Sequence, residues 1–409
     1  MTPPRAQATS RELTGQLAIL AAVLWAVALV NVTTPTRYLR TGQVKGTDFV
    51  QFYTLGRMAV SGQIQDFADR EAIRRTQLAL VPESSGMFFP ALYGPQVPLA
   101  LAPLGLLTYE GALMAWTGLT VVLYAAVVVV MIRLSDHLGA HRRLVLLGAA
   151  AFPPFWQLVQ HGQLTIVAIV AFGGAWRSMA AGRAGWAGAW LGLLAYKLPL
   201  LAPVVAVLVL AGGWRVLVPL AAVAAAQYAV ALPWVGVPGL VSYATLLINL
   251  PGLSPVVARP EQVHAWRGFW DLLFPGSPLA VWAYVVTAGA TVLLAAAAWR
   301  RHRDAGSRMT AIALTVALAA PYLYVYDLAL LAPAWIWLAD RAVRPTRTAQ
   351  RLTVWALALG YLAPLLGPVT ALVRLQASVP IFALLLWSLW RSGFHAPDTA
   401  RPAPDRVRG

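Results

Sequence analysis

The first long apolar run of the chain reads GQLAILAAVLWAVALVNVT, residues 15–33. Its length lies within the roughly 17–25 residues that an α-helix needs to cross a bilayer. Arg5 and Arg11 precede it, as in a signal peptide, but the run exceeds a typical signal core and no A-x-A cleavage pattern follows. We therefore predict that it is a retained first membrane span.

The composition extends this prediction to the whole chain. Of the 409 residues, 59% are hydrophobic and 11% are charged, whereas a soluble domain carries about 25% charged residues. We predict an all-α polytopic membrane protein with a single transmembrane domain over residues 15–390. The twelve predicted spans are 15–33, 110–132, 144–159, 162–177, 184–199, 200–213, 215–235, 278–299, 309–323, 325–339, 352–371 and 378–390.

The polar segments between the spans suggest an orientation. With residues 1–14 cytoplasmic, residues 34–109 and 236–277 form two outer loops, and the Pro- and Arg-rich tail, 391–409, is a disordered cytoplasmic segment. Inner segments then hold 20 Lys and Arg against 6 Asp and Glu, and outer segments 11 against 9. This asymmetry is the positive-inside pattern of a plasma membrane protein, here a bacterial-type inner membrane.

One apolar segment is predicted not to cross. Residues 91–107 are apolar but contain three prolines, so we expect a short helix that dips into the outer leaflet. A full crossing here would place the basic loop RLSDHLGAHRR outside. The net charge of +16 therefore follows from topology, and no nucleic-acid partner is expected.

The first outer loop contains a candidate interfacial helix, DFVQFYTLGRMAVSG, that ends at Gly62. Asp48, Gln51, Phe52 and Leu55 share one of its faces, and the other aromatic residues suit a membrane surface. Asp48 stands in the first turn, where a helix favours a carboxylate. It is therefore either a helix N-terminal residue paired with an Arg or a functional group.

Two ionisable residues lie within or between apolar runs. Lys197 would cost about 3 kcal/mol at mid-bilayer, so it either reaches the interface or binds a phosphate or carboxylate. Asp327 lies between two spans, where it is either functional or paired with an Arg or a tyrosine hydroxyl. Arg259 and Arg267 can equally pair with Glu261 and Asp271.

The sequence lacks several common motifs of nucleotide-binding, dinucleotide-binding and metal-dependent enzymes. It contains no Walker loop, no dinucleotide-binding glycine pattern, no HExxH and no cysteine. No inner loop is long enough to fold a nucleotide-sugar domain. We therefore expect neither a cofactor nor a metal.

The order of several motifs resembles glycosyltransferase family 87, polytopic enzymes of the GT-C fold. The first outer loop carries the Asp-Phe…Tyr…Gly-Arg…Ser-Gly string, followed by FFPALYGPQVPLALAPLGLL. The later motifs are HGQLTIVAIVAF, GWAGAWLGLLAYKLPLLAPV and SRMTAIALTVALAAPYLYVYDLALLAPA. The chain has Tyr93-Gly94-Pro95 where some members have Tyr-Pro-Pro, and tyrosines at YLYVYD where many have a His.

The resemblance implies a GT-C bundle of about twelve transmembrane helices with interfacial helices in the first outer loop. It also implies inverting transfer of a sugar, with mannose one candidate, from a polyprenyl-phosphate sugar to a glycolipid, glycan or other hydroxyl acceptor outside the cytoplasm. Asp48 takes the role of general base. The residues expected to bind phosphate, sugar or acceptor are Arg57, Tyr93, His161, Gln163, Lys197, Arg259, His264, Arg267, Tyr326 and Asp327.

Two other functions fit the sequence less closely. A twelve-span transporter or lipid flippase requires a polar path through the bilayer, whereas the outer side collects most of the polar residues here. A non-catalytic partner in an envelope-polymer assembly requires Asp48 to be buried and ion-paired.

Overall fold

The computed structural model describes residues 4–87, 92–249, 259–343 and 348–392. These residues form α-helices and short 3₁₀-helices, and the described ranges contain two isolated β-bridges but no strand. The predicted disordered tail lies outside the described residues from position 393 onward. The all-α prediction is confirmed for the described chain.

Five segments are long and apolar enough to cross a membrane. They are Glu12–Val32 of α1 (Pro4–Val32), α5 (Tyr109–Leu134), α11 (Trp214–Asn249), α14 (Pro278–Arg301) and Val354–Val373, which spans most of α17 (Thr348–Leu362), η8 (Ala363–Leu366) and α18 (Gly367–Val373). Shorter apolar helices pack among them, including α8 (Thr165–Ala180), α10 (Leu198–Ala211), α15 (Ala305–Ala319) and α19 (Ser378–Ser392). The chain is therefore a membrane protein, and the count of twelve crossings stays a prediction.

One predicted span is divided in the structure. The expected span 144–159 is two helices, α6 (Arg142–Ala150) and α7 (Pro153–His161), because Pro153 and Pro154 interrupt the hydrogen-bond ladder and suit only a helix start. Residues 236–277, the predicted second outer loop, begin within α11, and their place outside the membrane stays a prediction. There α11 bends at Gly236, with φ 64° and ψ 174°, and continues to Asn249 because Pro238 falls in the first turn after the bend.

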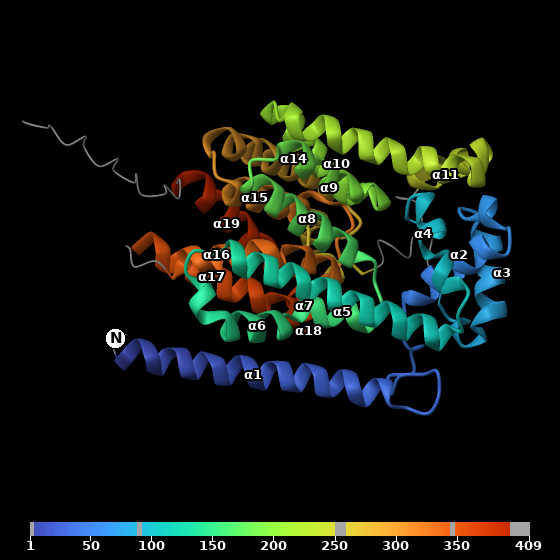
Figure 1. Cartoon of the computed structure of the whole chain (residues 1–409), viewed down its shortest axis with the longest axis horizontal. Helices are drawn as coiled ribbons and strands as arrows, with labels where there is room; N and C mark the ends of the chain where they lie inside the picture. Colours follow the sequence, from blue (N-terminus) through green and yellow to red (C-terminus); the bar gives the residue numbers. More distant parts are fainter. Residues whose placement is uncertain (1–3, 88–91, 250–258, 344–347, 393–409) are drawn as a thin grey trace, which may run out of the picture.

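Three short helices gather at one end of the bundle, on the right of Figure 1. They are α2 (Phe49–Val60), α3 (Arg70–Leu80) and α4 (Gln96–Gly105). A Cβ on Gly56 would lie 2.5 Å from the Leu101 carbonyl oxygen, and one on Gly105 would lie 2.5 Å from the backbone of Gly56. The two glycines therefore let α2 and α4 touch through their backbones, and the predicted helix after Asp48 is confirmed.

Several other helices break at this same end. The breaks fall between α7 and α8, between η4 (Leu193–Tyr196) and α10, and between α15 and η7 (Val325–Leu331), which leads into α16 (Ala332–Ala342). η7 packs against both α7 and α8, and η4 packs against α8. Helix ends expose main-chain polar groups and allow side chains to converge, so this end can build a polar site.

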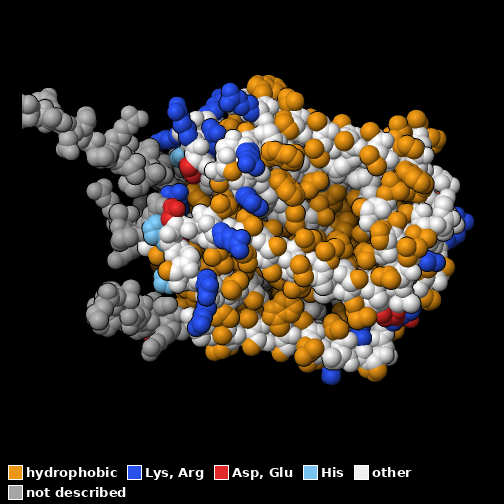
Figure 2. Space-filling model, in the orientation of Figure 1, with side chains coloured by type: hydrophobic (Ala, Val, Ile, Leu, Met, Phe, Trp, Pro, Cys, Tyr) orange, Lys and Arg blue, Asp and Glu red, His pale blue; other side chains and the backbone are white. Residues whose placement is uncertain are grey.

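The opposite end carries the positive charge. On the face shown in Figure 2, most Lys and Arg side chains lie toward the left, and a broad, mostly hydrophobic band separates them from the right-hand end, where Figure 1 places α2, α3 and α4. Arg133 closes α5, and Arg300 and Arg301 close α14, at this basic end. The bundle thus has a basic end and an end of converging helix breaks.

Candidate active site

Asp48 lies directly before α2 and is buried, with 8% of its surface exposed. Its side chain caps no backbone N–H of the helix. Instead, the amide Nε2 of Gln163 donates a hydrogen bond to Asp48 Oδ2. Within the described ranges no ion pair holds Asp48, so the alternative of an Arg-paired helix terminus does not describe it.

Gln163 reaches Asp48 because Gly162 allows a close approach. Gly162 ends α7 with φ 60°, and a Cβ there would lie 2.7 Å from Cβ of Phe49. The same Gln163 amide accepts a hydrogen bond from the Tyr93 hydroxyl at 3.1 Å through Oε1. One hydrogen-bonded row therefore joins the segment before α4, the α7–α8 turn and the start of α2.

Lys197 and Asp327 form a second buried pair. Lys197 Nζ lies 2.7 Å from Oδ2 and 2.9 Å from Oδ1 of Asp327, with exposed fractions of 5% and 0% for the two residues. The Thr165 hydroxyl donates to Asp327 Oδ1 at 2.7 Å, and the Tyr324 N–H donates to Oδ2 at 3.3 Å. Lys197 is therefore held inside the protein rather than extended to an interface.

Aromatic rings connect the two groups. Lys197 Nζ lies 6.0 Å from the ring centre of Tyr93 and 5.9 Å from that of Tyr326. The Tyr326 ring is 5.6 Å from the ring of His161, whose Nδ1 lies 2.9 Å from the Gln157 carbonyl oxygen. The structure thus brings six of the predicted residues into one cluster: Asp48, Tyr93, His161, Gln163, Lys197 and Tyr326, with Asp327 behind Lys197.

The surroundings change the proton affinity of Asp48. Burial raises the pKa of the Asp48 carboxyl above its ordinary value, because a charged carboxylate loses hydration. The charge of His161, the hydrogen bond from Gln163, the Tyr326 hydroxyl and the charge of Lys197 act in the opposite direction and lower it. A carboxylate with a raised pKa is a better proton acceptor than a solvated one.

The other predicted cations are not brought into this cluster. Arg57 donates to the Gly105 carbonyl at 2.9 Å, about 13 Å along α2 from Asp48 at 1.5 Å per residue. Arg267 pairs with Asp271 at 2.7 Å, which was the predicted alternative to a role in substrate binding. Arg259 is exposed, beside residues outside the described ranges.

His264, another predicted binding residue, is held by contacts of its own. The residue is buried, its Nδ1 lies 2.9 Å from the Ser378 hydroxyl, and its backbone N–H donates to the Leu323 carbonyl. Burial lowers the pKa of His264 to about 4, so the ring is neutral near pH 7. Its role in the structure is to tie the segment before α13 (Trp266–Leu273) to the loop after α15.

Two polar groups beside Asp48 were not predicted as site residues. Thr47 has φ 30°, a conformation that β-branched residues rarely adopt and that costs roughly 1–3 kcal/mol. The Thr47 hydroxyl and the Gln51 Oε1 atom are buried, and neither has a partner among the described residues. Only the helical spacing of Gln51 and Asp48 indicated that these residues share a face.

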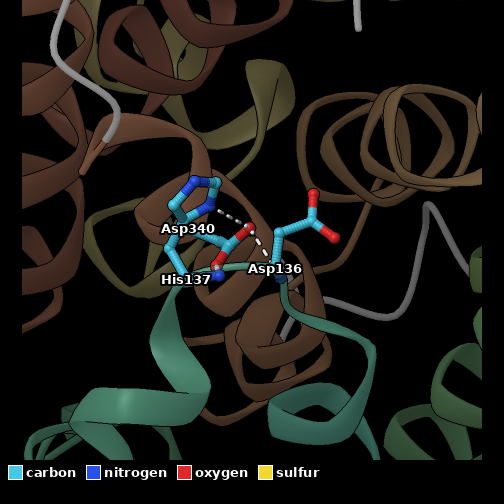
Figure 3. A group of neighbouring side chains, drawn as sticks. All are labelled: Asp136, His137 and Asp340. Carbon is cyan, nitrogen blue, oxygen red and sulfur yellow. Dashed lines mark hydrogen bonds and ion pairs between the residues drawn. The ribbon is translucent and has the colours of Figure 1, made fainter. Parts of the chain in front are cut away.

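A further group of titratable residues lies away from this site (Figure 3). Asp136 and His137 follow α5, and Asp340 belongs to α16; their potential ligand atoms lie within 4.8 Å of one another. However, Asp340 already accepts backbone N–H bonds from Asp136, His137 and Leu138 at 3.2, 2.8 and 2.9 Å. The carboxylate therefore acts as a tie between the loop after α5 and α16.

Comparison with protein-family models identifies one match. The model described as Glycosyltransferase family 87 matches residues 91–325, which is more than half of the chain. The match includes Tyr93, His161, Gln163 and Lys197, whereas Asp48 precedes it. Comparisons with curated proteins and with solved structures returned no match.

Proposed function

The chain belongs to glycosyltransferase family 87, and from this premise we propose that Asp48 is the general base of an inverting GT-C sugar transfer. The donor is a polyprenyl-phosphate sugar, and the acceptor is a hydroxyl group of a glycolipid or glycan. The reaction takes place at the outer face of a bacterial-type inner membrane. One observation carries the proposal: a buried carboxylate that is held by an amide rather than neutralised by a cation.

The chemistry requires one proton acceptor. The acceptor oxygen attacks the anomeric carbon and forms the new glycosidic bond, while its proton passes to the Asp48 carboxylate. The bond between the anomeric carbon and the phosphate oxygen breaks, and polyprenyl phosphate leaves with the electron pair. Because the leaving group is a phosphate, no general acid is needed. Attack opposite the departing oxygen inverts the anomeric configuration.

The growing charge on the phosphate requires a nearby donor. Lys197 has three N–H donors, and Asp327 accepts two of them. The third has no partner among the described residues, and the amine faces the rings of Tyr93 and Tyr326. We assign this donor to the donor phosphate, with Asp327 and Thr165 as the residues that position Lys197.

The acceptor side is assigned to the start of α2. Thr47 directly precedes Asp48 and Gln51 follows it by one helical turn, and neither the Thr47 hydroxyl nor Gln51 Oε1 has a partner among the described residues. A buried polar atom without a partner is costly, and a sugar acceptor supplies several hydroxyl groups that can satisfy both. The unusual backbone angle at Thr47 then keeps these groups beside the base.

The test is transfer by purified protein with a panel of polyprenyl-phosphate sugars and mass analysis of the lipid products. Asp48→Asn should lower kcat by roughly 10²–10⁴-fold, the usual contribution of a general base. Its melting temperature should equal or exceed that of the wild type, because a buried carboxylate with a raised pKa is disfavoured in its charged form.

Asp69→Asn is the matched control. Asp69 lies in the same outer segment but caps α3 by accepting from the N–H groups of Glu71 and Ala72. This variant should lose some stability and keep kcat. Full transfer by Asp48→Asn would contradict the base assignment, and lipid movement without any covalent product would instead indicate a flippase.

A further inference from the structure

A long apolar groove runs over the outside of the bundle, away from the Asp48 site. It encloses about 430 Å³ between α5, α8 and α9 (Ala184–Gly192). Val127 and Val130 form one wall, and Trp186 and Trp190 form the other. Gly173 and Gly174 form the floor, where a Cβ on Gly174 would lie 2.3 Å from Trp190. The absence of side chains at Gly173 and Gly174 therefore lets Val127 and Trp190, which line the groove, lie directly against the backbone of α8.

The groove has one polar end. Arg177 and Arg183 line it there, and both are exposed, with no ion pair to any described residue. α8 begins at Thr165, which contacts Asp327 in the active-site cluster. Arg177 is therefore about 18 Å from that end of α8 at 1.5 Å per residue, and the arginines lie toward the basic end of the bundle.

The groove has the length of one leaflet. Its lining runs from Val170 on α8 to Ala181, directly after α8, about 16 Å along a helix. Half of a bilayer's hydrocarbon core is about 15 Å. The exposed Trp186 lies beside the arginine end, and tryptophan is enriched where hydrocarbon meets head groups. The groove thus offers an apolar wall of acyl-chain length with two cations at head-group depth.

We propose that this groove binds an anionic phospholipid of the leaflet opposite the active site. One acyl chain lies between α5 and α9 against Val127, Val130 and Trp190, and the phosphate binds Arg177 and Arg183. Guanidinium groups match phosphate oxygens in pairs. A zwitterionic lipid adds a cationic group beside the two arginines, so an anionic head group is preferred.

The experiment is native mass spectrometry of the full chain in detergent with equimolar phosphatidylglycerol and phosphatidylcholine of identical acyl chains. We expect the wild type to retain phosphatidylglycerol about fivefold more than phosphatidylcholine, since each basic residue near a head group favours an anionic lipid. Arg177→Gln combined with Arg183→Gln should abolish this preference. Ala126→Trp, which fills the groove, should reduce retention of both lipids.

Arg301→Gln is the matched control, because Arg301 is exposed and closes α14 at the same basic end. It should retain the wild-type preference, and all variants should keep sugar transfer. Inorganic phosphate alone should not displace the bound lipid. Equal retention of the two lipids by the wild type, or an unchanged preference in the double Arg variant, would overturn the proposal.

Discussion

At Asp48, burial and neighbouring groups act on one proton in opposite directions. Loss of hydration favours the neutral acid, while His161, Gln163, Tyr326 and Lys197 favour the carboxylate. Burial prevails, so the pKa of Asp48 lies above its ordinary value of 3.8. The base form is present above this raised pKa and is lost as the pH falls through it. A change in any one neighbour should therefore move the acid limit of catalysis.

His161→Gln tests this balance. The charge of His161 lowers the pKa of Asp48, so its removal should raise that pKa and shift the acid limb of kcat to higher pH. The measurement is the pH profile of sugar transfer for both proteins. His137→Gln at the opposite end is the control and should leave the limb in place. A limb that moves to lower pH in His161→Gln would contradict the assignment of the limb to Asp48.

The buried pair Lys197–Asp327 makes a second prediction at the scale of single residues. Asp327→Asn leaves the amine of Lys197 without its charge partner, which should destabilise the fold by about 3–5 kcal/mol. Lys197→Met should also destabilise the fold, because it leaves the buried carboxylate of Asp327 without its cation. The double variant should recover part of the lost stability because neither buried charge remains.

The two readouts separate packing from function. Thermal unfolding should show the partial recovery in the double variant, whereas sugar transfer should stay lost, because no donor remains for the phosphate. A double variant with the summed instability of the two single variants would show that the pair does not couple. Recovery of transfer would remove Lys197 from the proposed mechanism.

At the scale of elements, α2 positions Asp48 through its contact with α4. Gly56 and Gly105 let the two backbones meet, and Tyr53, one turn before Gly56, donates to the carbonyl of Leu107, just after α4, at 2.8 Å. The burial of Phe49 and Phe52 fixes the rotation of α2. Because Asp48 directly precedes this helix, a shift of α2 moves the carboxylate away from Gln163.

Gly56→Ala should therefore reduce both stability and transfer. The new methyl group would meet the Leu101 carbonyl oxygen at 2.5 Å, and such overpacking costs about 1–3 kcal/mol. Gly118→Ala on α5 is the control, because a Cβ there meets nothing within 4 Å. It should raise the melting temperature slightly, since alanine favours a helix interior. Wild-type transfer by Gly56→Ala would show that α2 tolerates displacement.

The elements could be predicted from the sequence more fully than the contacts within the site. Long apolar runs and the helix after Asp48 follow from composition and spacing, and the structure confirms them. The partners within the site do not follow, because Asp48–Gln163 and Lys197–Asp327 join positions more than 100 residues apart. The neutral state of His264 depends on burial that only the packed structure supplies. Sequence thus indicates candidate residues and leaves their pairing open.

At the scale of the whole molecule, charge and polarity separate to opposite ends. The basic end holds Arg133, Arg300 and Arg301, and the other end holds the site. By the positive-inside rule, we expect the basic end to lie in the cytoplasm. We therefore expect the site to face the outside, with α3 and its neighbours exposed there.

Cysteine labelling can test this orientation, because the natural chain has no cysteine. Ser85→Cys near α3 should react with a membrane-impermeant maleimide on intact cells, because residue 85 is exposed at the site end. His141→Cys, exposed at the basic end, should react only after the membrane is permeabilised. The reverse pattern would invert the topology and place the site in the cytoplasm.

The pairing of Lys197 with Asp327 also has a consequence for how the chain is made. Residue 197 leaves the ribosome long before residue 327, so the amine enters the bilayer without its carboxylate. During that interval it is stabilised only by remaining near water at the surface, since an unpaired charge in hydrocarbon is costly. We therefore expect this pair to form late in biogenesis, so that a nascent chain released before η7 is inserted lacks it.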